Sequence, residues 1–218
     1  MHAEAPVRIV LLPGAFDTAE QVRAAGFDAA AAGLRPPLPI SVVEVEFRDM
    51  TDRSMLTRLR DGPLAEARAA GARVWLAGIS LGGFVAIACA ARFPAEVAGL
   101  CLIAPYLGTR LTSTEIARAG GLAHWSPRPG LPEDEDHALW RYLGLPPARR
   151  CPIYLGYGRE DRFADSQRLL GAALASSPSD AVDVVDGGHD WSAWRAAWDR
   201  FLGRWPGLAR PRAAGSAA

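Results

Sequence analysis

Residues 76–94, LAGISLGGFVAIACAARFP, set the architecture of this chain. They join an apolar run, RVWLAG at 73–78, to a segment over 82–92 whose small apolar residues predict a helix. The junction reads GISLG at 78–82. Glycines placed two residues before and after a serine let a strand and a helix approach closely around it. The stretch therefore predicts a sharp strand-to-helix turn with Ser80 at its tip.

Outward from this turn, short apolar runs alternate with longer helical patterns. This alternation predicts an α/β fold, a mostly parallel six-stranded sheet with helices on both faces. Several of the runs are almost continuously apolar, as strands buried on both faces should be. The expected strands are 7–12, 41–47, 73–78, 100–104, 152–157 and 182–187, and the expected helices are 18–33, 54–70, 82–92, 165–175 and 191–204.

The domain organisation follows from chain length and from one long connection. A chain of 218 residues suits a single domain over 1–218. The segment 105–151, between the fourth and fifth expected strands, is too long for a simple crossover. We expect it to be an insertion of two or three short helices over one end of the sheet. Residues from about 206 to 218 are rich in Pro, Gly and Ala and predict a frayed tail.

Composition excludes several classes of partner. The 24 basic and 24 acidic residues balance, whereas nucleic acids and anionic membrane surfaces favour a basic excess. The apolar run at 7–12 is too short for a signal peptide or a membrane span. Three scattered cysteines, at 89, 101 and 151, indicate reduced buried thiols and a cytoplasmic location. With no phosphate-binding loop and no zinc-ligand spacing, we expect neither cofactor nor metal.

Ser80 is a candidate nucleophile. A serine on such a turn stands clear of the backbone and faces the N-terminus of the following helix. Its hydroxyl needs a base. Of the four histidines, His2 lies in the terminal arm, and His124 and His137 lie in the insertion. His189 lies just past the sixth expected strand, in a glycine turn at the sheet edge where sites assemble, and is the expected base.

A carboxylate should orient that base. The loop GREDRF at 158–163 follows the fifth expected strand and contains Asp161, the expected acid. Glu160 and Asp165 are the alternatives.

The tetrahedral intermediate of acyl transfer needs an oxyanion hole. Leu81 can donate its backbone N–H from the turn. The loop PGAFD after the first strand offers a second donor, Ala15 first and Phe16 second. Losing one such donor typically costs about 2.7–4 kcal/mol in the transition state.

With Ser80, Asp161 and His189 in this chain order, the sequence resembles the α/β-hydrolases from residue 7 to about 205. The resemblance implies a serine hydrolase that cleaves a small-molecule carboxylic ester or thioester through a Ser-His-Asp triad and an acyl-enzyme. A non-catalytic, receptor-like ligand-binding member and an acyltransferase are the alternatives. The chain departs from the family in two ways. Two strands of the usual eight are missing at its start, and Pro13 precedes Gly14 where many relatives have histidine.

Aromatic residues supply the candidate walls of a substrate pocket. We expect Phe16, Tyr106 and Trp125 to contribute to it. Trp191 follows the histidine closely enough to touch a substrate. It also begins a row of aromatic residues spaced by three and four, which predicts one helical face packed on the sheet. That row comprises Trp191, Trp194, Trp198, Phe201 and Trp205.

Overall fold

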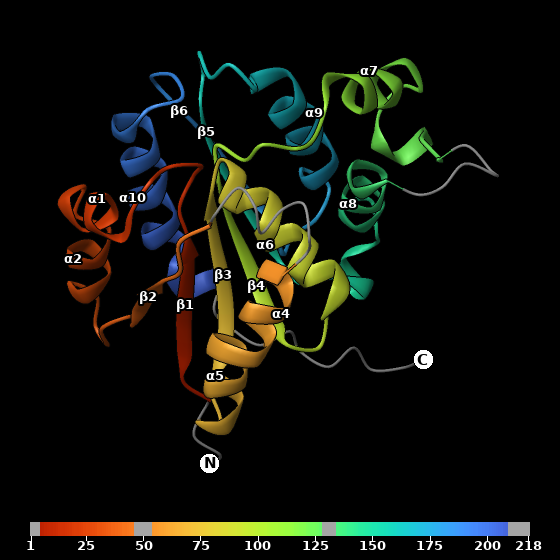
Figure 1. Ribbon diagram of the computed structural model, residues 1–218. Coiled ribbons are helices and arrows are strands. Elements are labelled where there is room, and N and C mark those ends of the chain that lie inside the picture. The colour runs from red at the N-terminus through yellow and green to blue at the C-terminus, as the bar shows by residue number, and fades with distance from the viewer. Residues whose placement is uncertain (1–4, 46–53, 128–133, 209–218) are drawn as a thin grey trace.

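A parallel sheet lies at the centre of the molecule. The computed structural model describes residues 5–45, 54–127 and 134–208. The described residues form six strands in the order β2-β1-β3-β4-β5-β6, all parallel (Figure 1). This confirms the predicted α/β class. The strands are β1 (Val7–Leu12), β2 (Ile40–Val42), β3 (Arg73–Ile79), β4 (Val97–Ile103), β5 (Ile153–Gly158) and β6 (Ala181–Val185).

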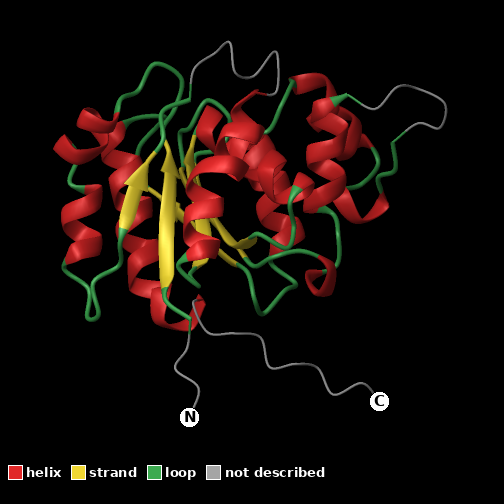
Figure 2. Ribbon diagram, turned by 60° about the horizontal axis from the view of Figure 1, so that its bottom comes forward, coloured by secondary structure: helices red, strands yellow, loops and turns green. Residues whose placement is uncertain are grey.

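Helices cover both faces of the sheet, as Figures 1 and 2 show. One face carries α1 (Ala19–Ala24), α2 (Phe27–Ala32) and α10 (Trp191–Leu208). The other face carries α4 (Ser54–Leu59), the π-helical turn η1 (Arg60–Leu64), α5 (Ala65–Ala69), α6 (Leu81–Arg92) and α9 (Ala164–Leu174).

The sheet separates two apolar cores, which explains the continuous apolar strands. Along β1, Ile9 and Leu11 pack with Trp198 of α10, whereas Val10 and Leu12 pack with the helices of the opposite face. Successive residues of a strand point to opposite faces, so both must be apolar. The aromatic row of α10 packs on its face of the sheet as predicted, with Phe201 against Trp75 of β3.

Two predicted helices are interrupted. The helix expected over 18–33 is two helices, because Gly26 adopts a left-handed conformation (φ 77°) that ends the first one. Over 54–70, Pro63 lies inside the helical segment and lacks the N–H of a regular turn. A π-helical turn accommodates it and the chain continues into α5.

Two predicted boundaries also differ. The last helix extends to Leu208 rather than 204, so the start of the predicted tail at 206 is helical. The strand expected over 41–47 is only Ile40–Val42, and residues 43–45 are not part of a strand. Residues 46 and 47 of that prediction and the remaining tail, 209–218, lie outside the described residues.

The long connection between β4 and β5 folds into short helices. They are α7 (Arg110–Arg118), η2 (Leu122–His124), α8 (Glu135–Leu143) and η3 (Pro147–Arg149). They pack beside α6 and α9 (Figure 1), where Leu139 and Trp140 join the core of that face. The Trp140 indole N–H donates to the Leu107 carbonyl at 2.9 Å, which ties α8 to the segment after β4. Within the described ranges, no helix combines the length and apolar character needed to cross a bilayer.

Candidate active site

Ser80 is the single residue between β3 and α6. Its backbone has φ 51° and ψ −114°, a strained conformation for a residue other than glycine. A Cβ on Gly82 would come within 2.5 Å of the Pro13 carbonyl oxygen, and one on Gly78 within 2.6 Å of the Gly83 Cα. Only glycine fits at these two positions, which confirms the sharp turn predicted from the sequence.

Ser80, His189 and Asp161 lie together at the carboxyl edge of the sheet. The Ser80 Oγ lies 2.9 Å from His189 Nε2, and His189 Nδ1 lies 2.8 Å from Asp161 Oδ2. The acid follows β5 and the histidine follows β6, as predicted. The Asp161 side chain is fully buried and the His189 side chain is 7% exposed. The buried carboxylate accepts the Nδ1–H, which leaves Nε2 to accept the Ser80 hydroxyl proton.

The structure separates the three acidic candidates. Asp165 is 95% exposed and pairs with Arg168 at 2.9 Å, away from the histidine. Glu160 accepts a hydrogen bond from the Gly187 N–H at 3.0 Å and so supports the loop that carries His189. Asp161 alone of the three contacts the His189 ring.

Two aromatic rings pack against the His189 ring. Sequence reasoning did not place either of them at the site. Phe163 and Trp194 each contact the His189 imidazole edge-on, with ring centroids 5.1 Å apart in both pairs. The Phe163 N–H also donates to Asp161 Oδ1 at 2.8 Å. Trp194 belongs to the aromatic row of α10, and that row was the available signal. The His189 ring is therefore held by packing as well as by its hydrogen bond with Asp161.

The loop after β1 lies against Ser80, the position expected of an oxyanion loop if Ser80 is the nucleophile. A Cβ on Gly14 would stand 3.4 Å from the Ser80 Cβ. Ala15 follows directly, and Phe16 adopts φ 67° with 89% of its surface exposed. Leu81 is the first residue of α6, so its N–H is among those that have no partner within the helix.

The candidate pocket residues differ in their distance from this site. The Tyr106 N–H donates to the Ser80 carbonyl at 2.9 Å. The Trp191 ring contacts the Trp194 ring at 4.9 Å and lies one ring from His189. Trp125 stacks on His137 at 5.7 Å and its indole N–H donates to Glu115 at 3.1 Å. These contacts anchor Trp125 within the insertion.

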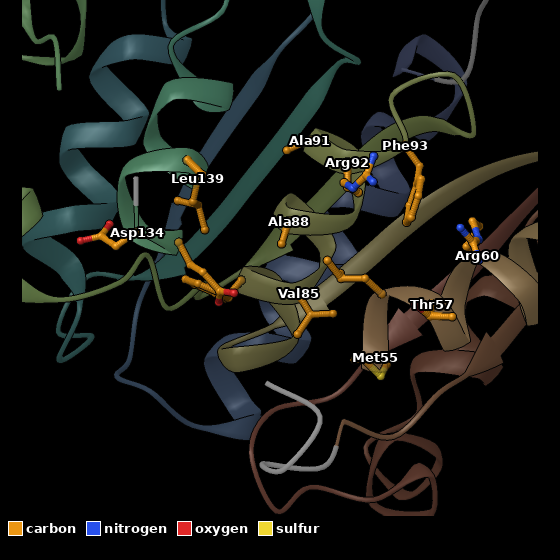
Figure 3. Close-up of a pocket in the computed structure, with 14 residues that line it drawn as sticks. Met55, Thr57, Arg60, Val85, Ala88, Ala91, Arg92, Phe93, Asp134 and Leu139 are labelled. Carbon is orange, nitrogen blue, oxygen red and sulfur yellow. The ribbon is translucent and has the colours of Figure 1, made fainter. Parts of the chain in front are cut away.

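A cavity of about 630 Å³ lies on the outer side of α6, between α4, η1 and the start of α8 (Figure 3). None of the three site residues lines it. Phe84 lines the cavity, and its ring lies tilted against that of Tyr106 with 5.9 Å between centroids. The Tyr106 ring in turn contacts the Phe163 ring at 5.5 Å. A continuous series of ring contacts thus links the lining of this cavity to the His189 ring.

The cysteines are poor rival nucleophiles. Burial raises the pKa of Cys89 to about 12 and that of Cys151 to about 11. Burial also raises the pKa of the fully enclosed Cys101 thiol. Because the thiolate is the reactive form, these thiols are inert near neutral pH.

Comparison with solved structures shows the same fold in several hydrolases. The S-formylglutathione hydrolase of Staphylococcus aureus superimposes with a TM-score of 0.65 at 14% identity, over 92% of this chain and 82% of that one. The fluorophosphonate-binding serine hydrolase F of the same organism gives 0.61 at 15% identity, over 96% and 86%. The monoacylglycerol lipase of Paleococcus ferrophilus gives 0.56 at 16% identity, over 93% and 96%.

Comparison by sequence finds a match to a protein family but none to an individual curated protein. A search of curated proteins finds none that matches. The model of the family described as "Putative esterase" matches residues 61–204, more than half of the chain, a range that includes Ser80, Asp161 and His189. The chain therefore belongs to this esterase family, within the α/β-hydrolase superfamily.

Proposed function

We propose that this chain is a serine hydrolase that cleaves a small-molecule carboxylic ester or thioester through an acyl-enzyme. The observation that carries the proposal is the continuous hydrogen-bonded line from Ser80 Oγ through His189 to Asp161, with links of 2.9 and 2.8 Å. Membership of the esterase family supports the reaction class.

The mechanism follows from the positions of these groups. Ser80 Oγ attacks the acyl carbon while His189 Nε2 takes its proton, and Asp161 stabilises the imidazolium that forms. The N–H groups of Leu81 and Ala15 hold the oxyanion of the tetrahedral intermediate. His189 then protonates the leaving alcohol or thiol. A water molecule, activated by the same histidine, releases the acid and restores Ser80.

We expect acyl groups of short or medium length, because neither Ser80 nor His189 lines the cavity beside α6 that could hold a longer chain. In a p-nitrophenyl ester series from acetyl to palmitoyl, we expect the highest kcat/KM below palmitoyl. A maximum at palmitoyl would contradict this assignment.

Labelling with a fluorophosphonate tests the nucleophile directly. Intact mass and peptide mapping should place one label on Ser80 of the wild type. Neither Ser80→Ala nor His189→Ala should be labelled, while both should keep the circular dichroism spectrum of the folded protein. An unlabelled but folded wild type would refute catalysis by Ser80 and favour a non-catalytic, ligand-binding member of the fold.

A further inference from the structure

An acidic side chain, Asp17, lies beside the nucleophile in the loop after β1. A Cβ on Gly14 would stand 2.5 Å from Asp17 Oδ2 and 3.4 Å from the Ser80 Cβ, so carboxylate and nucleophile flank the same glycine. Asp17 is half-buried, and this desolvation raises the pKa of its carboxyl group. The charge of His189 and the backbone of Gly14 lower that pKa to a smaller extent. Asp17 is therefore within electrostatic reach of the base.

The other carboxylates nearest the histidine are already engaged. Asp161 binds His189. Glu160 accepts a backbone N–H of the histidine loop, and Asp190 accepts backbone N–H groups at the start of α10. Over the described ranges, by contrast, no basic side chain forms an ion pair with Asp17. Its carboxylate is partly desolvated, and, of the described groups, only the backbone of Gly14 and the charge of His189 act to stabilise its negative charge.

A partly desolvated charge without a partner is stabilised when an opposite charge binds beside it. The residue next to Asp17 adds a second feature suited to a cation. Phe16 presents an aromatic ring that is 89% exposed, in the same loop. Aromatic faces attract ammonium groups through their quadrupole. The carboxylate of Asp17, close to Ser80, is the feature that would favour a cationic group next to the scissile bond, and the exposed Phe16 ring follows Ala15 in the same loop.

We propose that Asp17 selects esters that carry a positive charge near the scissile carbonyl and disfavours esters that carry a negative one. The proposal rests on Ser80 being the nucleophile. A carboxylate near the oxyanion hole opposes the negative charge that develops there, and a substrate cation beside Asp17 offsets this repulsion. Selection is thus expressed in kcat/KM. For charges about 6 Å apart and an effective dielectric constant of about 40, between the values for a protein surface and for water, Coulomb's law gives an effect of about tenfold for each charge.

The positive charge of Arg162, near the site, would favour anionic esters, the opposite of the effect of Asp17. The Arg162 guanidinium lies 5.0 Å from the centre of the Phe163 ring, which contacts His189. If Arg162 governed the local field, anionic esters would be preferred. The test therefore includes substrates of both signs.

Three aryl acetates separate the effects of charge from those of reactivity: 3-(trimethylammonio)phenyl, 3-nitrophenyl and 3-carboxyphenyl acetate. The measurement is kcat/KM at low ionic strength for the wild type, Asp17→Asn and Asp186→Asn. Asparagine keeps the shape of Asp17 and a hydrogen-bond acceptor. Asp186 is the matched control, because its side chain is 99% exposed after β6 and its change alters net charge equally.

We expect Asp17→Asn to lower kcat/KM for the cationic ester and raise it for the anionic one, each by about tenfold. Added salt should shrink the difference. The Asp186→Asn variant should keep the wild-type ratio. Two results would overturn the proposal. One is a ratio of kcat/KM for the cationic ester to kcat/KM for the anionic ester that is the same in Asp17→Asn and the wild type. The other is a wild-type preference for the anionic ester. Turnover of the neutral ester, abolished in Ser80→Ala, reports separately on the proposed function; without it, both proposals are refuted.

Discussion

The imidazole of His189 meets the indole of Trp194 edge-on, with 5.1 Å between their centroids. Trp194 comes from the first turn of α10, directly after the loop that carries the histidine. The Trp194 indole therefore links the orientation of the His189 ring, the proposed base, to the position of α10. This link matters for catalysis because small misplacements of catalytic groups reduce rates strongly.

We predict that Trp194→Leu lowers kcat by about tenfold or more with little change in KM, because His189 gains rotational freedom. Trp198 is the matched control: it lies one turn further on the same face, is fully buried and stacks on Phe27 rather than on the histidine. Trp198→Leu should destabilise the protein but leave kcat of the folded fraction unchanged. Equal losses of kcat in the two variants would show that Trp194 acts only through stability. Steady-state kinetics with thermal melts measure both quantities.

The acid assignment gives a paired prediction. Asp161→Asn should reduce kcat by about 10⁴-fold, because the asparagine amide no longer holds the histidine in the required tautomer. Asp165→Asn removes an exposed charge and should leave the rate within about twofold, as surface substitutions usually do. The reverse result would move the acid to Asp165. Ester hydrolysis by both variants, with their folding checked by circular dichroism, decides between them.

Two glycine substitutions, one beside Ser80 and one in α10, should have opposite effects on stability. Gly82→Ala would drive a methyl group into the backbone of Leu12 and Pro13, so it should lower the melting temperature and abolish turnover. In α10, a Cβ on Gly203 meets nothing within 4 Å. Gly203→Ala should stabilise the helix by about 0.4–1 kcal/mol, a rise of a few degrees at most. A stable, active Gly82→Ala variant would contradict the packing described for the turn.

His137 gives a prediction for stability against pH. A hydrogen bond with Asp134 raises its pKa above 6.5, and Glu115 adds to the effect while burial opposes it. Protonated His137 thus stabilises the fold fully below about pH 6.5, and this contribution is lost as pH rises through the raised value. At this partly exposed pair the effect should be about 1 kcal/mol or less.

The measurement is the melting temperature of His137→Gln against the wild type at pH 6 and pH 9. We expect a deficit of about 2 °C at pH 6 that disappears at pH 9. His124→Gln, at an exposed histidine of the same insertion, is the control for the loss of a histidine as such. A deficit that is larger at pH 9 would contradict the sign derived from the contacts.

Much of this fold could be predicted from the sequence, for physical reasons that differ between elements. The central strands are apolar on both faces because two helical layers bury them, so the apolar runs revealed all six strands. Their bounds were less exact: β2 is four residues shorter than predicted and β4 begins three residues earlier. Ser80 could be placed because the backbone there requires glycine on both sides. The places of His189 and Asp161 after the sixth and fifth expected strands made them the expected base and acid, and the structure brings both side chains together with Ser80.

Other features depend on contacts between segments that are far apart in the chain. The position of Asp17 beside Ser80 arises where the loop after β1 meets the start of α6, and no local pattern encodes that approach. The same holds for the edge-on contact of Phe163 with the base. The break at Gly26 was missed because a single glycine is compatible with a continuous helix as well as with a left-handed stop.

The short end strand β2 has a consequence for how molecules of this protein meet one another. An end strand exposes unpaired N–H and C=O groups that can template pairing with a second sheet. β2 has only three residues, and prolines stand at 36, 37 and 39 immediately before it. Proline donates no N–H, so an incoming strand finds too few partners to form a ladder. The short β2 edge of the sheet thus resists aggregation by pairing with strands of other molecules.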